Sequence, residues 1–130
     1  MPKTVILDYP GSGNPQHQSE YAGKFLQFTW RNQEYLVFAT FELHRYHNQI
    51  LGQFLSDNAV AHRWITKGML EVGDPDLEVA GGGRFLVSLD RKVLELWDTS
   101  QIYGRFDKNG LLEKIADAGH AWSGFRVEIL

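Results

Sequence analysis

The chain has no cysteine among its 130 residues. This excludes a disulfide framework, a thiolate nucleophile and a metal site built on cysteine. It has no run of about eighteen apolar residues, so the sequence predicts no membrane span. It also has no excess of positive charge, because 13 basic residues stand against 16 acidic ones, for a net charge of −3. We therefore expect no broad electrostatic binding to nucleic acid or to a membrane surface.

The size and composition are those of one ordinary globular domain, with 43% hydrophobic and 22% charged residues. A second domain would leave each half close to the size at which a hydrophobic core becomes marginal. The first apolar stretch is too short for a secretory signal, and an acidic residue follows it directly. We expect a single cytoplasmic domain over residues 1–130.

The hydrophobic pattern predicts an α+β fold, with helices packed on a mixed sheet. The expected strands are 4–9, 25–30, 34–41, 77–89, 93–97 and 125–130. Strand 34–41 is continuously apolar, which is typical of a strand buried on both faces. Helical spacing begins at His47 and recurs over 59–69, as two helices or one bent helix. A last helix over 111–116 has Asp107 or Asn109 as candidate N-caps and Gly119 as its end.

Three consecutive glycines, Gly81 to Gly83, interrupt the fourth strand just before Arg84. Glycines weaken a strand, so they need a structural reason. A β-bulge with an incidental arginine is one explanation. The other is a close approach of the backbone to a ligand, with the Arg84 guanidinium offered to a phosphate or carboxylate.

Among the five histidines, only His47 stands at the expected start of a helix. The unpaired N–H groups and positive dipole of such a position bind anions, and imidazole suits proton transfer near neutrality. A histidine at the core edge with an ordinary hydrogen bond is the competing interpretation. His44 and His47 lack a third ligand at a suitable spacing, so we expect no metal.

The motifs of several large enzyme classes are missing. There is no Gly-x-Ser-x-Gly elbow, Walker loop, His-Glu-x-x-His motif or dinucleotide-binding glycine pattern. Acyl transfer and nucleotide hydrolysis therefore have no support, and we expect no cofactor.

Four features in order resemble the phosphohistidine phosphatase family, which includes the Janus and Ocnus proteins. They are Tyr46 and His47 before Ile50 and Leu51, then Gly81 to Arg84, then Ser100 before Tyr103 and Gly104, and finally Glu113 to Ile115 before a last strand. The resemblance covers most of residues 34–130, whereas residues 1–33 diverge from it.

The resemblance implies a metal-independent hydrolase that acts on a phosphohistidine or another phosphoramidate, in a phosphorylated protein or a small molecule. It implies His47 as base or nucleophile, and a second alignment puts His62 in that role. It implies that the phosphate is bound by Asn48, Gly83, Arg84, Ser100, Ile102 and Lys3, with Asn48 and Ile102 acting through their backbone N–H groups. Glu34 is the alternative to Lys3.

Departures from the family pattern support a second hypothesis. The arginine that the family has upstream of the histidine falls at Ala39, and its histidine-bearing loop is Arg105 to Lys108 here. A module that binds an anion or a protein partner without catalysis would retain the fold and lose these groups. A further hypothesis places a homodimer interface on aromatic residues of the N-terminal strands, namely Tyr21, Phe25, Phe28 and Trp30.

Overall fold

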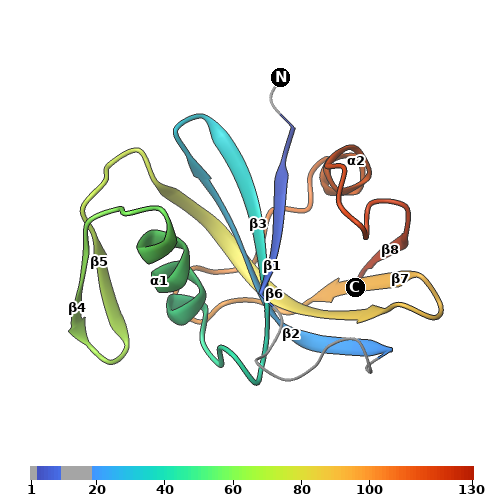
Figure 1. Ribbon diagram of the computed structural model, residues 1–130, viewed down its shortest axis with the longest axis horizontal. Coiled ribbons are helices and arrows are strands. Elements are labelled where there is room, and N and C mark those ends of the chain that lie inside the picture. The colour runs from blue at the N-terminus through green and yellow to red at the C-terminus, as the bar shows by residue number, and fades with distance from the viewer. Residues whose placement is uncertain (1–2, 10–18) are drawn as a thin grey trace.

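The computed structural model describes residues 3–9 and 19–130. They form an α+β domain with a mixed sheet of six strands, in the order β1-β3-β2-β6-β7-β8, and a separate two-stranded hairpin (Figure 1). β1 pairs with β3, and β7 with β8, in parallel, whereas the other neighbours in the sheet are antiparallel. Within the described residues, no helix is long and apolar enough to cross a membrane.

The elements follow the chain in the order β, β, β, α, β, β, β, β, α, β. Their bounds are β1 Val5–Tyr9, β2 Glu20–Trp30, β3 Gln33–Thr40, α1 His47–Asp57, β4 His62–Thr66, β5 Met69–Val72, β6 Glu78–Ser88, β7 Val93–Trp97, α2 Leu111–Asp117 and β8 Arg126–Ile129.

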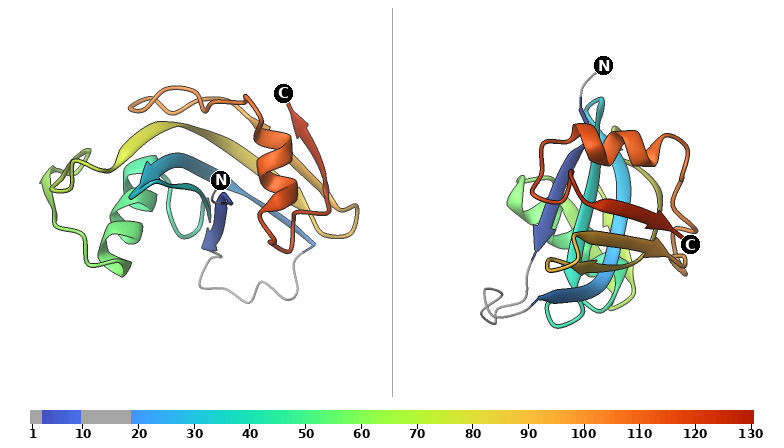
Figure 2. Two further views of the ribbon diagram at one scale, coloured as in Figure 1. Left: turned by 90° about the horizontal axis from the view of Figure 1, so that it is seen from above. Right: turned by 90° about the vertical axis from the view of Figure 1, so that its right-hand side faces the viewer.

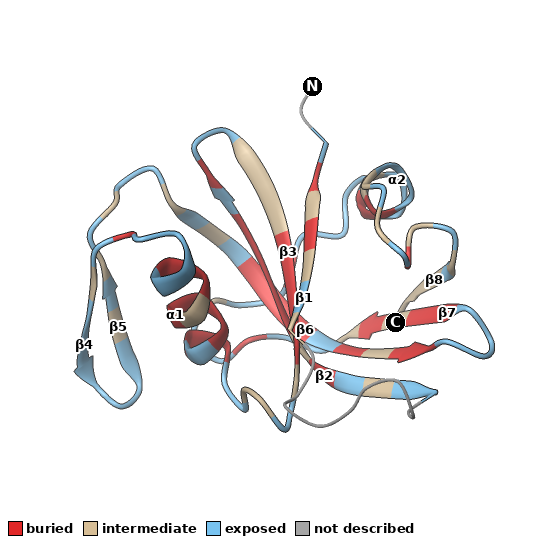
Figure 3. Cartoon of the chain, viewed as in Figure 1, coloured by how far each residue is buried: buried red, intermediate tan, exposed pale blue. Residues whose placement is uncertain are grey.

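Each face of the large sheet carries its own hydrophobic core, because side chains alternate along a strand. On β3, Val37 and Ala39 pack with the buried face of α1, while Leu36 and Phe38 pack with α2 and the segment around Trp122. The sheet therefore lies between the two helices, as the view from above shows (Figure 2). The buried side of α1 faces the sheet (Figure 3). The expectation that 34–41 is buried on both faces is confirmed for Leu36 to Ala39.

The helix predicted over 59–69 is wrong, because this segment forms most of the β4–β5 hairpin. Residues 67 and 68 connect the strands, since Thr66 pairs with Met69. The Trp64 indole packs on α1 where Gly52 has no side chain, and a Cβ on Gly52 would lie 3.0 Å from its Cζ2. Trp64 and Ile65 fit helical spacing, yet aromatic and β-branched residues also favour strands.

One smaller expectation also fails. The N-cap of α2 is Gly110 at φ 69°, without a side-chain cap, so neither Asp107 nor Asn109 caps the helix. Gly119 does follow the end of α2, in a left-handed conformation. The aromatic residues assigned to a dimer interface belong to this chain's own cores: Phe25, Phe28 and Trp30 are buried, and Tyr21 is partly buried against one of the cores.

Candidate functional site

His47 is the first residue of α1, and its ring lies against the glycines of β6. A Cβ on Gly82 would stand 2.6 Å from the His47 Cδ2 atom and 2.7 Å from Nε2, closer than real Cβ contacts allow. Gly82 also lies directly opposite Leu26 of β2, on the face of the sheet that α1 covers. The absence of a side chain at Gly82 therefore makes room for the imidazole.

The neighbouring glycines have steric reasons of their own. A Cβ on Gly81 would come within 2.3 Å of the Arg105 carbonyl oxygen, and one on Gly83 within 2.5 Å of the Trp97 carbonyl oxygen. A register shift in the β2–β6 pairing occurs between Gln27 and Phe28, next to the partner of Gly81. The irregularity fits the interpretation as a β-bulge, whereas the approach of a ligand stays a prediction. The approaching groups are the protein's own.

The Gly83 carbonyl fixes the orientation of the His47 ring. Its oxygen lies 3.1 Å from Nε2, and because a carbonyl only accepts, Nε2 carries the proton. The neutral ring then has its lone pair on Nδ1. Burial lowers the pKa of His47 below its ordinary value of 6.5, and the nearby Lys24 ammonium acts in the same direction, while the carbonyls of Gly83 and Phe25 oppose them. His47 is accordingly neutral, with a basic Nδ1, at neutral pH.

A depression of about 370 Å³, which we call the His47 hollow, opens beside this ring. Its polar lining includes two cations, because Lys24 of β2 stands directly opposite Arg84 of β6 on the same face of the sheet. Burial and the Arg84 charge lower the pKa of Lys24, and Asp98 opposes this. The other chemically relevant lining residues are His47, Asp98, Ser100 and Ile102.

Ser100 and Ile102 reach the hollow from the loop after β7. Ser100 is buried, and its Oγ accepts a hydrogen bond of 3.1 Å from the Tyr103 N–H. That bond uses the oxygen as acceptor, so the hydroxyl proton remains available to a ligand. The loop is closed by two backbone bonds between Ser100 and Gly104, which hold the hydroxyl in place.

One acidic group also lines the hollow. The Asp98 Oδ2 atom lies 3.1 Å from the Nε of Arg84, and both side chains are close to half exposed. Within residues 3–9 and 19–130, the terminal nitrogens of Arg84 make no hydrogen bond, so the guanidinium still offers its fork to a ligand. Asp98 thus orients Arg84 and also places a negative charge beside any anion in the hollow.

The Asn48 side chain makes its hydrogen bonds within the protein. It is buried, donates to the Gly68 carbonyl at 2.6 Å, and accepts from the Tyr103 hydroxyl. Because Tyr103 also donates its N–H to Ser100, this network joins the hairpin, the start of α1 and the Ser100 loop. Asn48 does not line the hollow. Its backbone N–H lies in the first turn of α1, where helical N–H groups have no intrahelical partner.

The structure therefore gathers His47, Arg84, Ser100 and Ile102 around one hollow, with Gly83 holding the histidine. Two predicted residues lie elsewhere. Lys3 precedes the edge strand β1, where its carbonyl accepts a hydrogen bond from Gln33. His62 starts β4 and contacts Val60 and Ser56.

The structure also shows where Glu34 lies and whether metal-ligating side chains gather. Glu34, the alternative to Lys3, pairs with Lys114 of α2 at 3.1 Å and accepts from Thr4, away from the hollow. No group of three metal-ligating side chains occurs in the described part of the chain.

Lys24 is the site residue that the sequence reasoning missed. The predicted strand began at Phe25, five residues after the observed start of β2 at Glu20, so Lys24 fell just outside it, and the cation sought for the phosphate was placed at Lys3. A lysine at the head of an apolar strand is a weak signal, and only the register between β2 and β6 puts it beside Arg84. No protein-family model matches this chain, and no curated protein matches it either.

Proposed function

We propose that this chain hydrolyses the P–N bond of a phosphoramidate such as phosphohistidine, without a metal ion, in the His47 hollow. The observation that carries the proposal is the convergence of the His47 imidazole, the Lys24 and Arg84 cations and the Ser100 hydroxyl on one hollow. The resemblance to phosphohistidine phosphatases agrees with it. The P–N bond is intrinsically labile, so positioning and charge stabilisation are the main requirements for the protein.

Each group has a role in this reaction. Arg84, Lys24, the Ser100 hydroxyl and the Ile102 N–H hold the phosphoryl oxygens. The lone pair on His47 Nδ1 takes a proton from the water that attacks phosphorus, and the P–N bond breaks. The leaving nitrogen takes a proton from solvent, and the His47 imidazolium returns its proton to solvent, so that the amine and phosphate are released and the neutral ring is restored. In the nucleophilic variant of the reaction, Nδ1 attacks phosphorus itself, and water then cleaves the phosphorylated His47.

The test is phosphate release from a phosphohistidine peptide and from free phosphoramidate. Replacing His47 by Ala is expected to abolish turnover. Because this change empties a buried position, His47→Gln is tested beside it, since its amide can still donate to Gly83. His62→Ala is the control and is expected to retain full activity. Unchanged turnover in both His47 variants overturns the proposal, and loss of activity in the control moves the role to His62.

A second function is favoured by one observation, the Asp98 carboxylate within the hollow. A negative charge next to Arg84 opposes a dianion, which suits a module that binds a partner or a less charged anion without catalysis. Phosphate binding in a titration, with no hydrolysis at any pH, would select this function over the enzymatic one.

A further inference from the structure

A second depression opens directly beside the His47 hollow. This outer groove has a volume of about 430 Å³ and is lined by Lys24, Phe41, Glu42, Arg45, Tyr46 and Arg84. Lys24, Tyr46 and Arg84 also line the His47 hollow. The two depressions therefore adjoin each other across these three side chains, and the groove is the nearest surface for a part of the ligand that lies outside the hollow.

Two exposed aromatic rings line the outer groove, and one of them, Tyr46, also lines the His47 hollow. Tyr46 is 62% exposed and Phe41 is 39% exposed. The Lys24 Nζ lies 5.5 Å from the centroid of the Tyr46 ring, and the Arg84 Cζ lies 5.9 Å from that of Phe41. Each shared cation thus stands over one ring. Exposed aromatics interleaved with arginine are typical of surfaces that bind other polypeptides.

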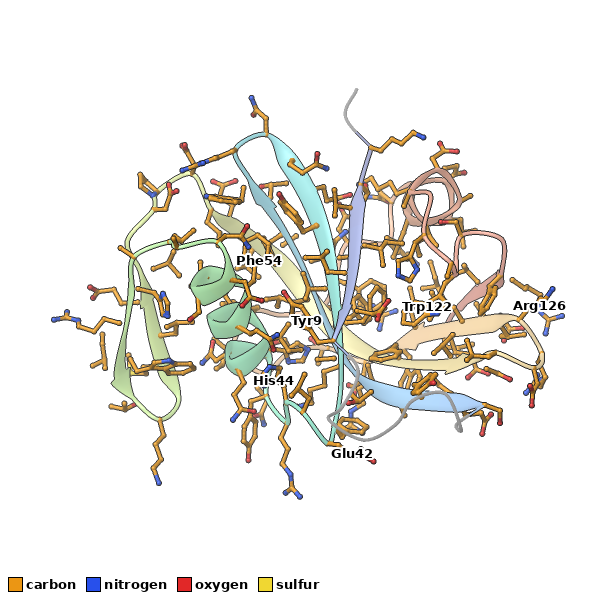
Figure 4. The ribbon with its side chains drawn as sticks, in the orientation of Figure 1. Tyr9, Glu42, His44, Phe54, Trp122 and Arg126 are labelled. Carbon is orange, nitrogen blue, oxygen red and sulfur yellow. The ribbon has the colours of Figure 1, made fainter. Side chains whose placement is uncertain are left out.

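The charge of the groove is basic, although the chain as a whole is acidic. Lys24, Arg45 and Arg84 oppose the single carboxylate of Glu42 in its lining. Glu42 lies on the loop between β3 and α1, and Figure 4 labels it together with His44 of the same loop. Across the residues that the structure describes, the Arg45 guanidinium forms no ion pair. Its charge is therefore free for a ligand outside the hollow.

The shape of the groove favours a chain over a small molecule. Small-molecule sites usually enclose most of their ligand, whereas this groove is bordered by exposed side chains, among them Phe41, Arg45 and Tyr46. Free phosphoramidate would fill the hollow alone and leave the groove empty.

We propose that the outer groove binds the polypeptide segment next to the phosphorylated residue and that Arg45 selects an acidic side chain in that segment. The inference rests on the proposed function, because the phosphoryl group in the His47 hollow sets the register of the peptide. Arg45 is a specificity-determining residue in this account and takes no part in the chemical step.

The test uses two phosphohistidine peptides that differ only in having two Asp or two Lys beside the phosphorylated residue, with free phosphoramidate as the small substrate. Arg45→Glu is compared with the native chain. Arg91→Glu is the matched control, because Arg91 is also an exposed arginine and lies in the turn between β6 and β7. Both kcat/KM and the dissociation constants of the peptides are measured.

The native chain and Arg91→Glu are expected to favour the Asp peptide about three- to tenfold, as for exposed charge pairs. Arg45→Glu is expected to lose or reverse this preference while phosphoramidate turnover changes less than about twofold. An equal preference for both peptides in the native chain, or an unaltered preference in Arg45→Glu, overturns the inference. If no substrate is hydrolysed but the native chain still binds the Asp peptide more tightly, the hydrolytic function is overturned and the assignment of the groove is kept.

Discussion

The His47 imidazole packs against the Cα of Gly82, and the space between α1 and β6 at this point holds a hydrogen atom but not a methyl group. The same ring is held at 3.1 Å by the carbonyl of the next residue, Gly83. Gly82 thus makes room for the histidine ring within β6, a strand inside the sheet, whereas Gly81 and Gly83 make room for the Arg105 and Trp97 carbonyls.

Gly82→Ala is expected to displace the imidazole, because the new methyl group would also meet the Phe25 carbonyl oxygen at 2.7 Å. Overpacking of this kind costs about 1–3 kcal/mol of stability, and we expect turnover to fall at least about tenfold as the imidazole is displaced from its position beside the hollow. Gly124→Ala is the control, since nothing lies within 4 Å of a Cβ there. Denaturant unfolding and phosphate-release assays measure both effects. Equal losses of stability and turnover in the two variants would contradict the role of Gly82 in making room for His47.

The lowered pKa of His47 predicts the acid limb of the pH profile. Since Nδ1 acts only when the ring is neutral, kcat/KM corrected for uncatalysed hydrolysis is expected to fall with an apparent pKa below 6.5. This limb should be absent from the residual activity of His47→Gln. An apparent pKa above 6.5 would contradict the argument, because burial disfavours the charged ring.

The same shift predicts how stability depends on pH. Below pH 6.5 the unfolded chain binds a proton at His47 more readily than the folded chain does, so this contribution to stability is complete above pH 6.5 and is lost as the pH falls. His47→Gln is expected to flatten the dependence in that window. Urea unfolding at a series of pH values measures the free energy of unfolding of both proteins. The same dependence of this free energy on pH in the native chain and in His47→Gln would contradict the prediction.

Asp98→Asn is expected to tighten phosphate binding. The change removes the negative charge beside Arg84 while the amide can still contact Nε, and asparagine tolerates the left-handed backbone, φ 70°, of this position. We expect the dissociation constant of inorganic phosphate to fall about three- to tenfold, or roughly 1 kcal/mol. Isothermal titration calorimetry measures it, with Asp90→Asn, in the exposed β6–β7 turn, as the control. Weaker binding in Asp98→Asn would show that orienting Arg84 is the greater effect.

Asn48→Ala is expected to loosen the site through the network that joins it to Gly68 and Tyr103. The change leaves the Gly68 carbonyl and the Tyr103 hydroxyl without their partner, at a cost of about 1–3 kcal/mol. Tyr103→Phe removes only one of the two bonds and should cost less. Thermal unfolding ranks the variants, and a Tyr103→Phe cost equal to or above that of Asn48→Ala would contradict the network.

Local patterns were sufficient for most of the architecture. A continuous apolar run predicted the strand around Leu36, apolar segments bounded by turn residues predicted the strands around Val87 and Leu94, and helical spacing predicted α1 from His47. The hairpin was missed because Trp64 and Ile65 fit both the helical and the strand period, and the pairing with β5 and the packing of the indole on Gly52 are not visible in the local pattern. The α2 cap was missed because Gly110 caps through its backbone conformation rather than through a side chain.

The candidate site was predictable where a residue carries its own signal and unpredictable where pairing across the sheet defines it. His47 stood at a helix start, and Arg84 followed three glycines. Lys24 gains its place only from the register with Arg84. Lys3 was placed in the site by alignment alone, although β1 lies at the edge of the sheet, beyond β3 and β2.

The central claim is that an anion binds between the His47 ring, the Arg84 guanidinium and the Ser100 loop. A ¹⁵N NMR titration with inorganic phosphate tests it most directly. We predict saturable shifts with one dissociation constant at the backbone amides of Asn48 and Ile102 and at Nδ1 of His47, and their loss in Arg84→Ala. Titrated spectra in which these three signals stay still, or move equally in Arg84→Ala, would contradict it.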